Sequence, residues 1–552
     1  MSRRIEWTLL GLVLAAGAWL RFSHLDLLQF QSDETTAVIL ALRFVQSGQV
    51  PLAGLMSSVG VTNPPLFIYL LIPIFAFTSN PVVACCTIAG LGLASVAVCW
   101  WIGRTYYGAV TGLVAAGLFA VAPWAIIHTR VIWAQDLVPV FTTLTMWAVH
   151  ALVLGRRPRA IFWVILLPLC VVQVHFAGLA FVAAVVVILL WLRPKVDWRW
   201  AAAGAAGAAV LLLPYLAYQT KNGWADFRRA LQTMGGQGHQ IPKGMTVHPE
   251  FGYRLPQREP WGQALAIMNS GQIEDVLGLS AGRQFDLAKV YDRNRRGSPA
   301  YFDETLTWGT SLLLFQRVWF LVALGYQAVR AVRAWRAGKA FPFFSVADEA
   351  VGRGAWIMWW WILGPLAVFW ATGLWTYLTY YVILYPVHYL ACGMMVQAIS
   401  ERWKQTRQRM VIGAVVVAVL LGNFVFMMDF YRFVGRYGGA HGTYGTSVGF
   451  KRAAARFVAK RTDVKRLMAE GRLMQMDSLG KVEPPQLEFQ FLALQESPPA
   501  TEITPTNLVV LVVDRNRSNF PPPSLAELTQ MARLTGIAET NFGPMHVYFL
   551  KR

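Results

Sequence analysis

Long apolar segments recur along almost the whole chain of 552 residues, and they limit the folds that it can adopt. A helix needs roughly 20 apolar residues to cross a hydrocarbon core of about 30 Å. Segments that approach this length lie at 7–25, 83–103, 109–127, 136–154, 160–174, 177–193, 200–217, 309–329, 355–373, 378–399 and 410–428. The low share of charged residues, 14%, is also unlike that of soluble globular proteins. The sequence therefore predicts a polytopic α-helical membrane protein with about eleven transmembrane helices.

The positive charge of the chain indicates its topology. Its net charge of +20 would by itself be compatible with nucleic-acid binding. The basic residues, however, gather in short loops between apolar segments, as in 104–109, 155–159, 193–199, 330–339 and 402–409. Cytoplasmic loops of membrane proteins have this composition. We therefore expect no nucleic-acid partner, a cytoplasmic N-terminus with a retained signal anchor, and a C-terminus on the outer side.

The remaining polar regions would then lie outside the membrane. They are the first outer loop at 26–82, a second loop at 218–308 and the tail at 429–552. The tail alternates helical and strand patterns and predicts a small extracytoplasmic α/β domain after a transmembrane domain at 1–428. The apolar part of the first loop, 63–80, predicts a short interfacial or re-entrant helix. All five cysteines lie in apolar segments, so no disulfide framework is expected.

The stretch "QFQSDETTAV" places two carboxylates, Asp33 and Glu34, just after the first apolar segment. Asp33 could simply cap a short helix that ends at Gly48, because acidic side chains stabilise a helix amino end. Alternatively, a carboxylate at the outer membrane surface is partly desolvated and could act as a general base. The two roles are compatible.

A second polar stretch, "HTRVIWAQDLVPVF", brings His128, Arg130 and Asp136 to the same predicted outer surface. Asp136 could cap the fourth crossing helix, and Arg130 could be an interface residue whose charge reaches water. His175 lies in the hairpin "VQVHFAG", where a histidine is more often structural than catalytic.

Three elements thus follow in order on the outer side: "SDETT", "NPPLFIYL" and "AQDLVPVF". Together they resemble the C-type glycosyltransferase superfamily, in particular its bacterial branch similar to protein O-mannosyltransferases and the lipid A aminoarabinose transferase. The resemblance rests on about the first 200 residues; further on, only "TYYVILYPVHYL" and the external domain are similar in architecture.

The resemblance implies that one sugar moves from a polyprenyl-phosphate carrier to an acceptor on the outer face, with inversion. The acceptor would be a lipid, a glycan or a protein, and the location the cytoplasmic membrane of a bacterium. Asp33 matches the acidic residue of the family's first loop, Glu34 its neighbour, and Asp136 the aspartate at the fourth helix. This chain departs from the family at Asn63, where many relatives carry His or Lys, at "VVACCT" and at Thr379–Tyr380, where Arg is frequent.

A lipid phosphate is a good leaving group, so such a reaction needs a base for the acceptor and a cation for the phosphate. Candidates for the cation are Arg130 and three residues of the second loop, Lys243, Arg254 and Arg258, since Arg matches phosphate geometry. No dedicated metal site is expected from His239, His248 and Glu250, although a divalent cation could take part. Aromatic residues such as Tyr69, Trp133 and Tyr381 could line a groove for isoprenoid or sugar.

Two readings from other classes stay open. A transporter or flippase of a lipid-linked sugar would place charged or broken helices near the bilayer midplane. A non-catalytic membrane subunit would use its external domain for binding and would tolerate the loss of Asp33.

Overall fold

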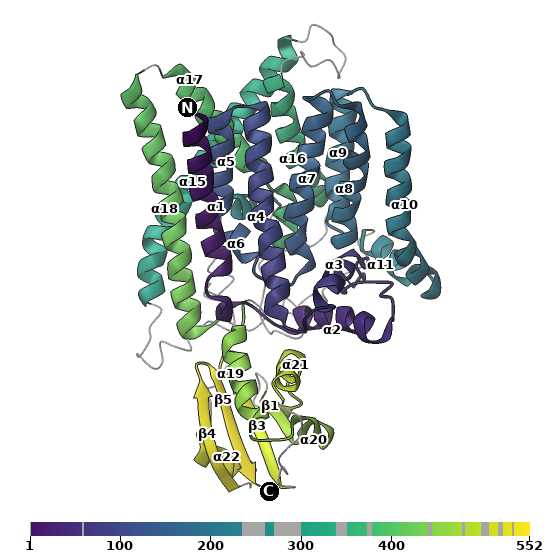
Figure 1. Cartoon of the computed structure of the whole chain (residues 1–552), viewed down its shortest axis with the longest axis vertical. Coiled ribbons are helices and arrows are strands. Elements are labelled where there is room, and N and C mark those ends of the chain that lie inside the picture. Colours follow the sequence, from purple (N-terminus) through teal and green to yellow (C-terminus); the bar gives the residue numbers. More distant parts are fainter. Residues whose placement is uncertain are drawn as a thin grey trace.

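A computed structural model describes most of the chain. The described residues are 2–57, 60–234, 260–269, 300–337, 350–372, 378–403, 405–439, 444–476, 481–497, 507–516, 523–532 and 535–551. They form a helical bundle with a small mixed domain below it (Figure 1).

A helix lies at every range where the sequence predicts a membrane crossing. The helices are α1 (Arg3–Phe22), α4 (Pro81–Tyr106), α5 (Ala109–Val121), α7 (Val138–Val153), α8 (Ile161–Val174), α9 (Gly178–Leu192), α10 (Trp198–Lys221), α15 (Ala300–Ala337), α16 (Ala350–Thr372), α17 (Val387–Arg402) and α18 (Thr406–Tyr437). Among the described residues, six helices are long and apolar enough to cross a membrane, or seven if the bent pair Leu378–Leu384 and Val387–Arg402 is one span. The chain is a membrane protein, and the count of eleven stays a prediction.

Short helices cover the end of the bundle away from the N-terminus (Figure 1). They include α2 (Ser32–Ser47), α3 (Leu66–Phe75) and α11 (Ala225–Met234), with α6 (Pro123–Ile127) and the 3-10 turns η1 (Leu25–Leu27) and η2 (Ala134–Leu137). Helix α3 has ten residues, which is too short for a crossing and agrees with the short helix predicted there. The remaining elements of the bundle are η3 (Pro158–Ala160), α12 (Pro260–Asn269) and η4 (Leu378–Leu384).

The C-terminal part is an α/β unit, as the alternating patterns predict. Its strands are β1 (Leu473–Met476), β2 (Val482–Glu483), β3 (Leu508–Asp514), β4 (Thr535–Phe542) and β5 (Met545–Lys551), in the order β2-β1-β3-β5-β4. Strands β1 and β3 are parallel, and the other pairs are antiparallel. The central strand β3 is buried along its whole length, which explains its unbroken apolar run "LVVLVVD". The helices are α19 (Val448–Ala459), α20 (Val464–Ala469), α21 (Leu487–Gln495) and α22 (Leu525–Ala532).

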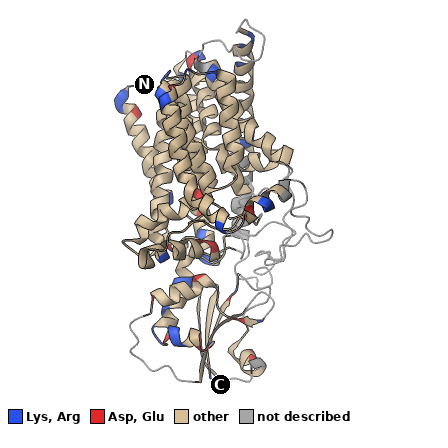
Figure 2. Ribbon diagram, turned by 90° about the vertical axis from the view of Figure 1, so that its right-hand side faces the viewer, with Lys and Arg blue, Asp and Glu red and all other residues tan. Residues whose placement is uncertain are grey.

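The N-terminus and the α/β unit lie at opposite ends of the bundle (Figure 1), as the predicted odd number of crossings requires. Lys and Arg residues, blue in Figure 2, lie mainly at the two ends of the bundle and in the α/β unit, whereas the middle of the bundle is almost entirely tan. At the N-terminal end, the Arg104 Nε donates to Glu6 Oε1 at 2.5 Å and so ties α4 to α1. The assignment of this end to the cytoplasm is still a prediction from the charge pattern.

Helices α4 and α5 approach each other closely because glycines face each other. A Cβ added at Gly103 would lie 2.7 Å from the Cα of Gly112, and one added at Gly112 would lie 2.7 Å from the carbonyl oxygen of Trp100. Small residues allow this approach between membrane helices, where packing rather than the hydrophobic effect drives association.

We expect Gly103→Ala to lower the stability of the purified protein by about 1–3 kcal/mol, because the added methyl group must push backbone atoms apart. Thermal unfolding in detergent measures this. The matched control is Gly11→Ala in α1, where an added Cβ meets nothing within 4 Å. Equal melting temperatures for both variants would contradict the close packing.

Candidate active site

The amino end of α2 holds the two adjacent carboxylates in different environments. Glu34 is fully buried, whereas Asp33 is exposed to solvent. The Glu34 carboxylate accepts hydrogen bonds from Gln29 Nε2 at 2.9 Å and from the backbone amide of Gln31 at 3.1 Å. Burial raises the pKa of Glu34 to about 7, and the neighbouring charge of Asp33 adds to the shift. A buried carboxyl of this kind changes its charge near neutral pH.

The alternative in which Asp33 caps this helix is wrong in its detail. The N-cap residue is Gln31, Asp33 is the second residue of the helix, and Glu34 reaches back to the Gln31 amide. The end at Gly48 is confirmed: this residue adopts the left-handed conformation, with φ 70°, that glycine tolerates best. Capping is therefore carried out by Gln31 and Glu34, and Asp33 lies at the surface.

His128 and Asp136 form a buried pair next to η2. Nδ1 of His128 lies 3.1 Å from Oδ1 of Asp136, and the backbone amide of Trp133 donates to the other carboxylate oxygen at 3.0 Å. The second bond is a cap at the start of the fourth predicted crossing, so Asp136 does have the structural role that the sequence left open. Nε2 of His128 is buried without a hydrogen-bond partner in the described structure.

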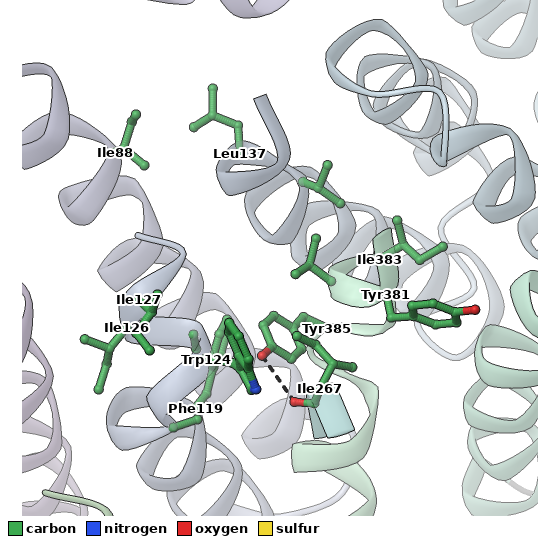
Figure 3. Close-up of a cluster of buried hydrophobic side chains, with 14 of the residues drawn as sticks. Ile88, Phe119, Trp124, Ile126, Ile127, Leu137, Ile267, Tyr381, Ile383 and Tyr385 are labelled. Atoms are coloured by element: carbon green, nitrogen blue, oxygen red, sulfur yellow. Dashed lines mark hydrogen bonds between the residues drawn. The ribbon is translucent and has the colours of Figure 1, made fainter. Parts of the chain in front are cut away.

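Apolar side chains from the same elements surround this pair. The imidazole of His128 stacks on Trp124, with ring centroids 5.5 Å apart. Figure 3 shows Trp124 and Leu137 among buried side chains that continue through Ile127 to Tyr385, whose hydroxyl donates to the Ile267 carbonyl. The apolar surroundings keep water from the His128–Asp136 pair, which strengthens the interaction between the two groups.

Arg130 is buried and binds the end of α1. One terminal nitrogen donates to the carbonyls of Arg21 and Ser23, both at 2.7 Å, and to that of Leu20 at 3.3 Å; the other donates to the His24 carbonyl at 2.7 Å. Its guanidinium also lies over the ring of Tyr431, 4.7 Å from the centroid. The last carbonyls of a helix have no partner within the helix, and Arg130 supplies one. Its terminal nitrogens are thus engaged with the backbone.

Three of the predicted residues converge at the start of α4. Cys85 in the first turns of that helix is within electrostatic range of Glu34, Arg130 and Asp136. The Glu34 carboxylate also acts electrostatically on Asp136. The structure thus joins the first-loop acid Glu34 with the stretch that contains His128, Arg130 and Asp136. We call these four residues the acidic centre.

Other predicted residues lie in a second group or in separate places. Asn63 donates to the Leu55 carbonyl at 3.1 Å, and its amide oxygen accepts from the Phe176 amide at 3.4 Å, which brings it beside His175. His175 accepts from the Ala177 amide at 3.2 Å and packs against Tyr380.

Tyr69 and Tyr381, the two tyrosines predicted to line a groove, make their contacts with other residues than those of the acidic centre. The Tyr69 hydroxyl donates to the Pro51 carbonyl at 2.6 Å, and Tyr381 is fully buried against Phe369, with ring centroids 5.1 Å apart. Tyr381 is therefore core in this structure, and it is not exposed to a groove.

The basic candidates of the second loop, Lys243, Arg254 and Arg258, lie outside the described residues, as do His239, His248 and Glu250. Within the described part of the chain, no group of three or more His, Cys, Asp or Glu side chains could hold a metal ion.

Sequence reasoning missed the contribution of the α/β unit. Lys451 of α19 is buried, and its ammonium donates to the Phe30 carbonyl at 2.7 Å and to Glu488 Oε1 at 3.1 Å. Glu488 of α21 accepts from the Ser32 hydroxyl at 3.3 Å, and Lys451 acts electrostatically on Glu34. In the sequence, Lys451 is one of several cations on an amphipathic helix, and nothing distinguishes it from its exposed neighbours.

The fold is similar to that of a solved structure of the aminoarabinose transferase ArnT, which agrees with the resemblance seen in the sequence at the level of the fold. No family model and no curated protein matches the sequence itself. Among solved structures, the chain is similar to ArnT from Cupriavidus metallidurans bound to undecaprenyl phosphate, with a TM-score of 0.50, 13% identity and coverage of 98% of this chain and 97% of that one. The apo state of the same protein gives a TM-score of 0.49 at 12% identity and covers 99% of this chain and 98% of that one. A third similar structure is the oligosaccharyltransferase AglB from Archaeoglobus fulgidus in complex with an inhibitory peptide and a dolichol-phosphate. Its TM-score is 0.45 at 10% identity, and the match covers 84% of this chain and 59% of that one.

Replacing Arg130 with Gln or Lys should destabilise the protein by about 3 kcal/mol or more, because several buried carbonyls lose their donors. Arg130→Lys should not restore stability, since a compact ammonium cannot reach the four carbonyls that the planar guanidinium binds. Thermal unfolding in detergent measures both. Arg436→Gln, an exposed change on α18, is the control and should be near wild type. A wild-type melting temperature for Arg130→Lys would show that the charge alone suffices.

The raised pKa of Glu34 gives stability a defined pH dependence. The folded protein holds the Glu34 proton up to about pH 7, whereas the unfolded chain releases it near 4.5, so the stability falls as the pH rises between these values. The loss is about 3 kcal/mol at 1.36 kcal/mol per pKa unit. In Glu34→Gln this part of the pH dependence should vanish. Melting temperatures of both proteins between pH 5 and 8 test it, and parallel curves would contradict the assignment.

Proposed function

We propose that this protein is a glycosyltransferase that moves a single sugar from a polyprenyl-phosphate donor to an acceptor at the outer membrane face, with inversion. The fold supports the class, because the ArnT structure of similar fold binds undecaprenyl phosphate. The observation that carries the proposal is an exposed carboxylate, Asp33, next to the buried acidic centre at one end of the bundle. The acceptor is a lipid, a glycan or a protein.

Asp33 is the general base of this proposal. A catalytic base must reach the proton that it removes. The exposed Asp33 can do so, whereas Glu34 is buried and its carboxylate is hydrogen-bonded to Gln29 and Gln31. Asp33 takes the proton from the acceptor hydroxyl or amine while the acceptor atom attacks the anomeric carbon. The bond between that carbon and the phosphate oxygen breaks, and the phosphate leaves with the electron pair. Asp136 and Glu34 hold the surrounding backbone through their amide contacts.

A cation for the leaving phosphate is the second requirement. Arg130 uses its terminal nitrogens on the carbonyls of α1, so its role in this proposal is to fix the end of that helix. Lys243, Arg254 and Arg258 are the candidates for binding the phosphate, with a divalent cation as the alternative. We place the protein in the cytoplasmic membrane of a bacterium. The N-terminus then lies inside and the α/β unit outside, as the charge pattern predicts.

Asp33→Asn should reduce sugar transfer by about 10²–10⁴-fold, the range that a general base contributes. The assay is transfer from a panel of radiolabelled polyprenyl-phosphate monosaccharides in membranes that contain matched amounts of protein. Donor binding should persist, because the exposed Asp33 is not part of the buried packing.

Gln46→Ala, an exposed change further along α2, is the control for this measurement and should transfer at the wild-type rate. Equal transfer by wild type and Asp33→Asn would reject Asp33 as the base. The absence of transfer by wild type from every donor, with acceptor present, would reject the enzyme and favour transport or binding.

A further inference from the structure

A cavity of about 290 Å³ lies between the bundle and the α/β unit. It adjoins Arg130 of the acidic centre, because Arg130 contacts two of its lining residues, His24 and Tyr431. Its lining comes from the segment after α1, from the last turns of α18 and from the start of α19. These three elements meet where the bundle gives way to the α/β unit (Figure 1). The cavity therefore lies near the level of the membrane surface.

One wall of the cavity is built to accept an anion. Ser447, the N-cap residue of α19, is fully buried, and its hydroxyl has no hydrogen-bond partner in the described structure. The amide of Val448 is taken by the Leu28 carbonyl at 2.8 Å, but helix geometry gives the amides of Gly449 and Phe450 no acceptor within α19. Both residues line the cavity. A buried hydroxyl beside the amino end of a twelve-residue helix is a suitable partner for phosphate oxygens.

Charged side chains of both signs also line the cavity. Arg432 and His24 lie on it, and the His24 ring is stacked on Tyr431, with centroids 5.2 Å apart. The exposed acid Asp26 lies beside the first turn of α19, where a Cβ added at Gly449 would be 3.0 Å from the Asp26 Cβ. Arg432 also pairs with Asp429 at 2.9 Å, so its guanidinium is held on this side of α18. An anion alone would be repelled by Asp26, whereas a group with a phosphate and a nearby cation would satisfy both the amino end of α19 and the adjacent Asp26.

The helices that lead to the cavity expose apolar side chains. Trp19 and Phe22 of α1, and Leu421 and Val425 of α18, are all more than a third exposed. Both helices are apolar enough to cross a membrane, so these side chains face acyl chains. A molecule with a polar headgroup in the cavity could therefore place its hydrocarbon tails along α1 and α18.

We propose that this cavity binds the headgroup of a zwitterionic phospholipid, with the phosphodiester at Ser447 and the amino end of α19 and the ammonium at Asp26. Arg432 supplies the second contact to the phosphate. The site binds a lipid of the surrounding bilayer and is independent of the proposed sugar transfer. It fixes the α/β unit to the membrane surface.

Native mass spectrometry of the full-length protein in detergent tests the proposal with added phosphatidylethanolamine or phosphatidylglycerol. Wild type should retain phosphatidylethanolamine, and Ser447→Ala and Arg432→Gln should each weaken its binding about tenfold, since each removes a hydrogen bond to a charged group. Asp26→Asn should abolish the preference for phosphatidylethanolamine over phosphatidylglycerol. The matched control is Arg436→Gln, one turn further along α18 and outside the cavity lining, which should bind as wild type does.

Equal lipid retention by wild type and by the Ser447 and Arg432 variants, all folded by circular dichroism, would overturn the proposal. Displacement of the lipid by millimolar inorganic phosphate with the same dependence on Ser447 would also overturn it, because the site would then hold free phosphate. Equal binding of the two lipids by wild type would overturn the ammonium contact at Asp26.

Discussion

The binding of one buried guanidinium to the end of a helix organises the outer side of this protein. Arg130 donates to four carbonyls at the end of α1, and Tyr431 of α18 donates its hydroxyl to one of them, that of Leu20. A chain that leaves the membrane exposes carbonyls that neither lipid nor helix can satisfy. Because Arg130 satisfies them, the first loop starts at a fixed point and direction. The position of α2, and therefore of Asp33 and Glu34, follows from that start.

Much of the fold could be predicted because a membrane imposes strong periodic demands on a sequence. Each predicted apolar range contains a helix, and the unbroken run around Val510 forms the buried central strand of the α/β unit. The finer division of roles at the site was harder to predict. Asp33 and Glu34 are adjacent and similar in the sequence, and only the geometry of the Gln31 cap buries one and exposes the other. Such a difference depends on tertiary contacts that have no local pattern.

The role of Arg130 illustrates the same limit. An arginine near an outer interface fits phosphate binding and helix capping equally well, since both use its planar set of donors. The contacts of its terminal nitrogens with α1 and of its guanidinium with the ring of Tyr431 come from elements that are not near Arg130 in the sequence, so no local pattern predicts them. Likewise, Lys451 is buried because α21 brings Glu488 next to it, which requires the complete α/β unit.

The contact of Lys451 with the Phe30 carbonyl has a consequence for the synthesis of the chain. The two residues are separated by 421 positions, and Ser32 and Glu488 by 456. The ribosome therefore completes every helix of the bundle before Lys451 and Glu488 exist. The loop that bears Asp33 and Glu34 emerges early, is fixed at its start by Arg130, and gains its contacts with the α/β unit last. A chain that stops short of α21 would lack the Glu488 contact with Ser32, so the amino end of α2 gains its full set of contacts only with the finished polypeptide.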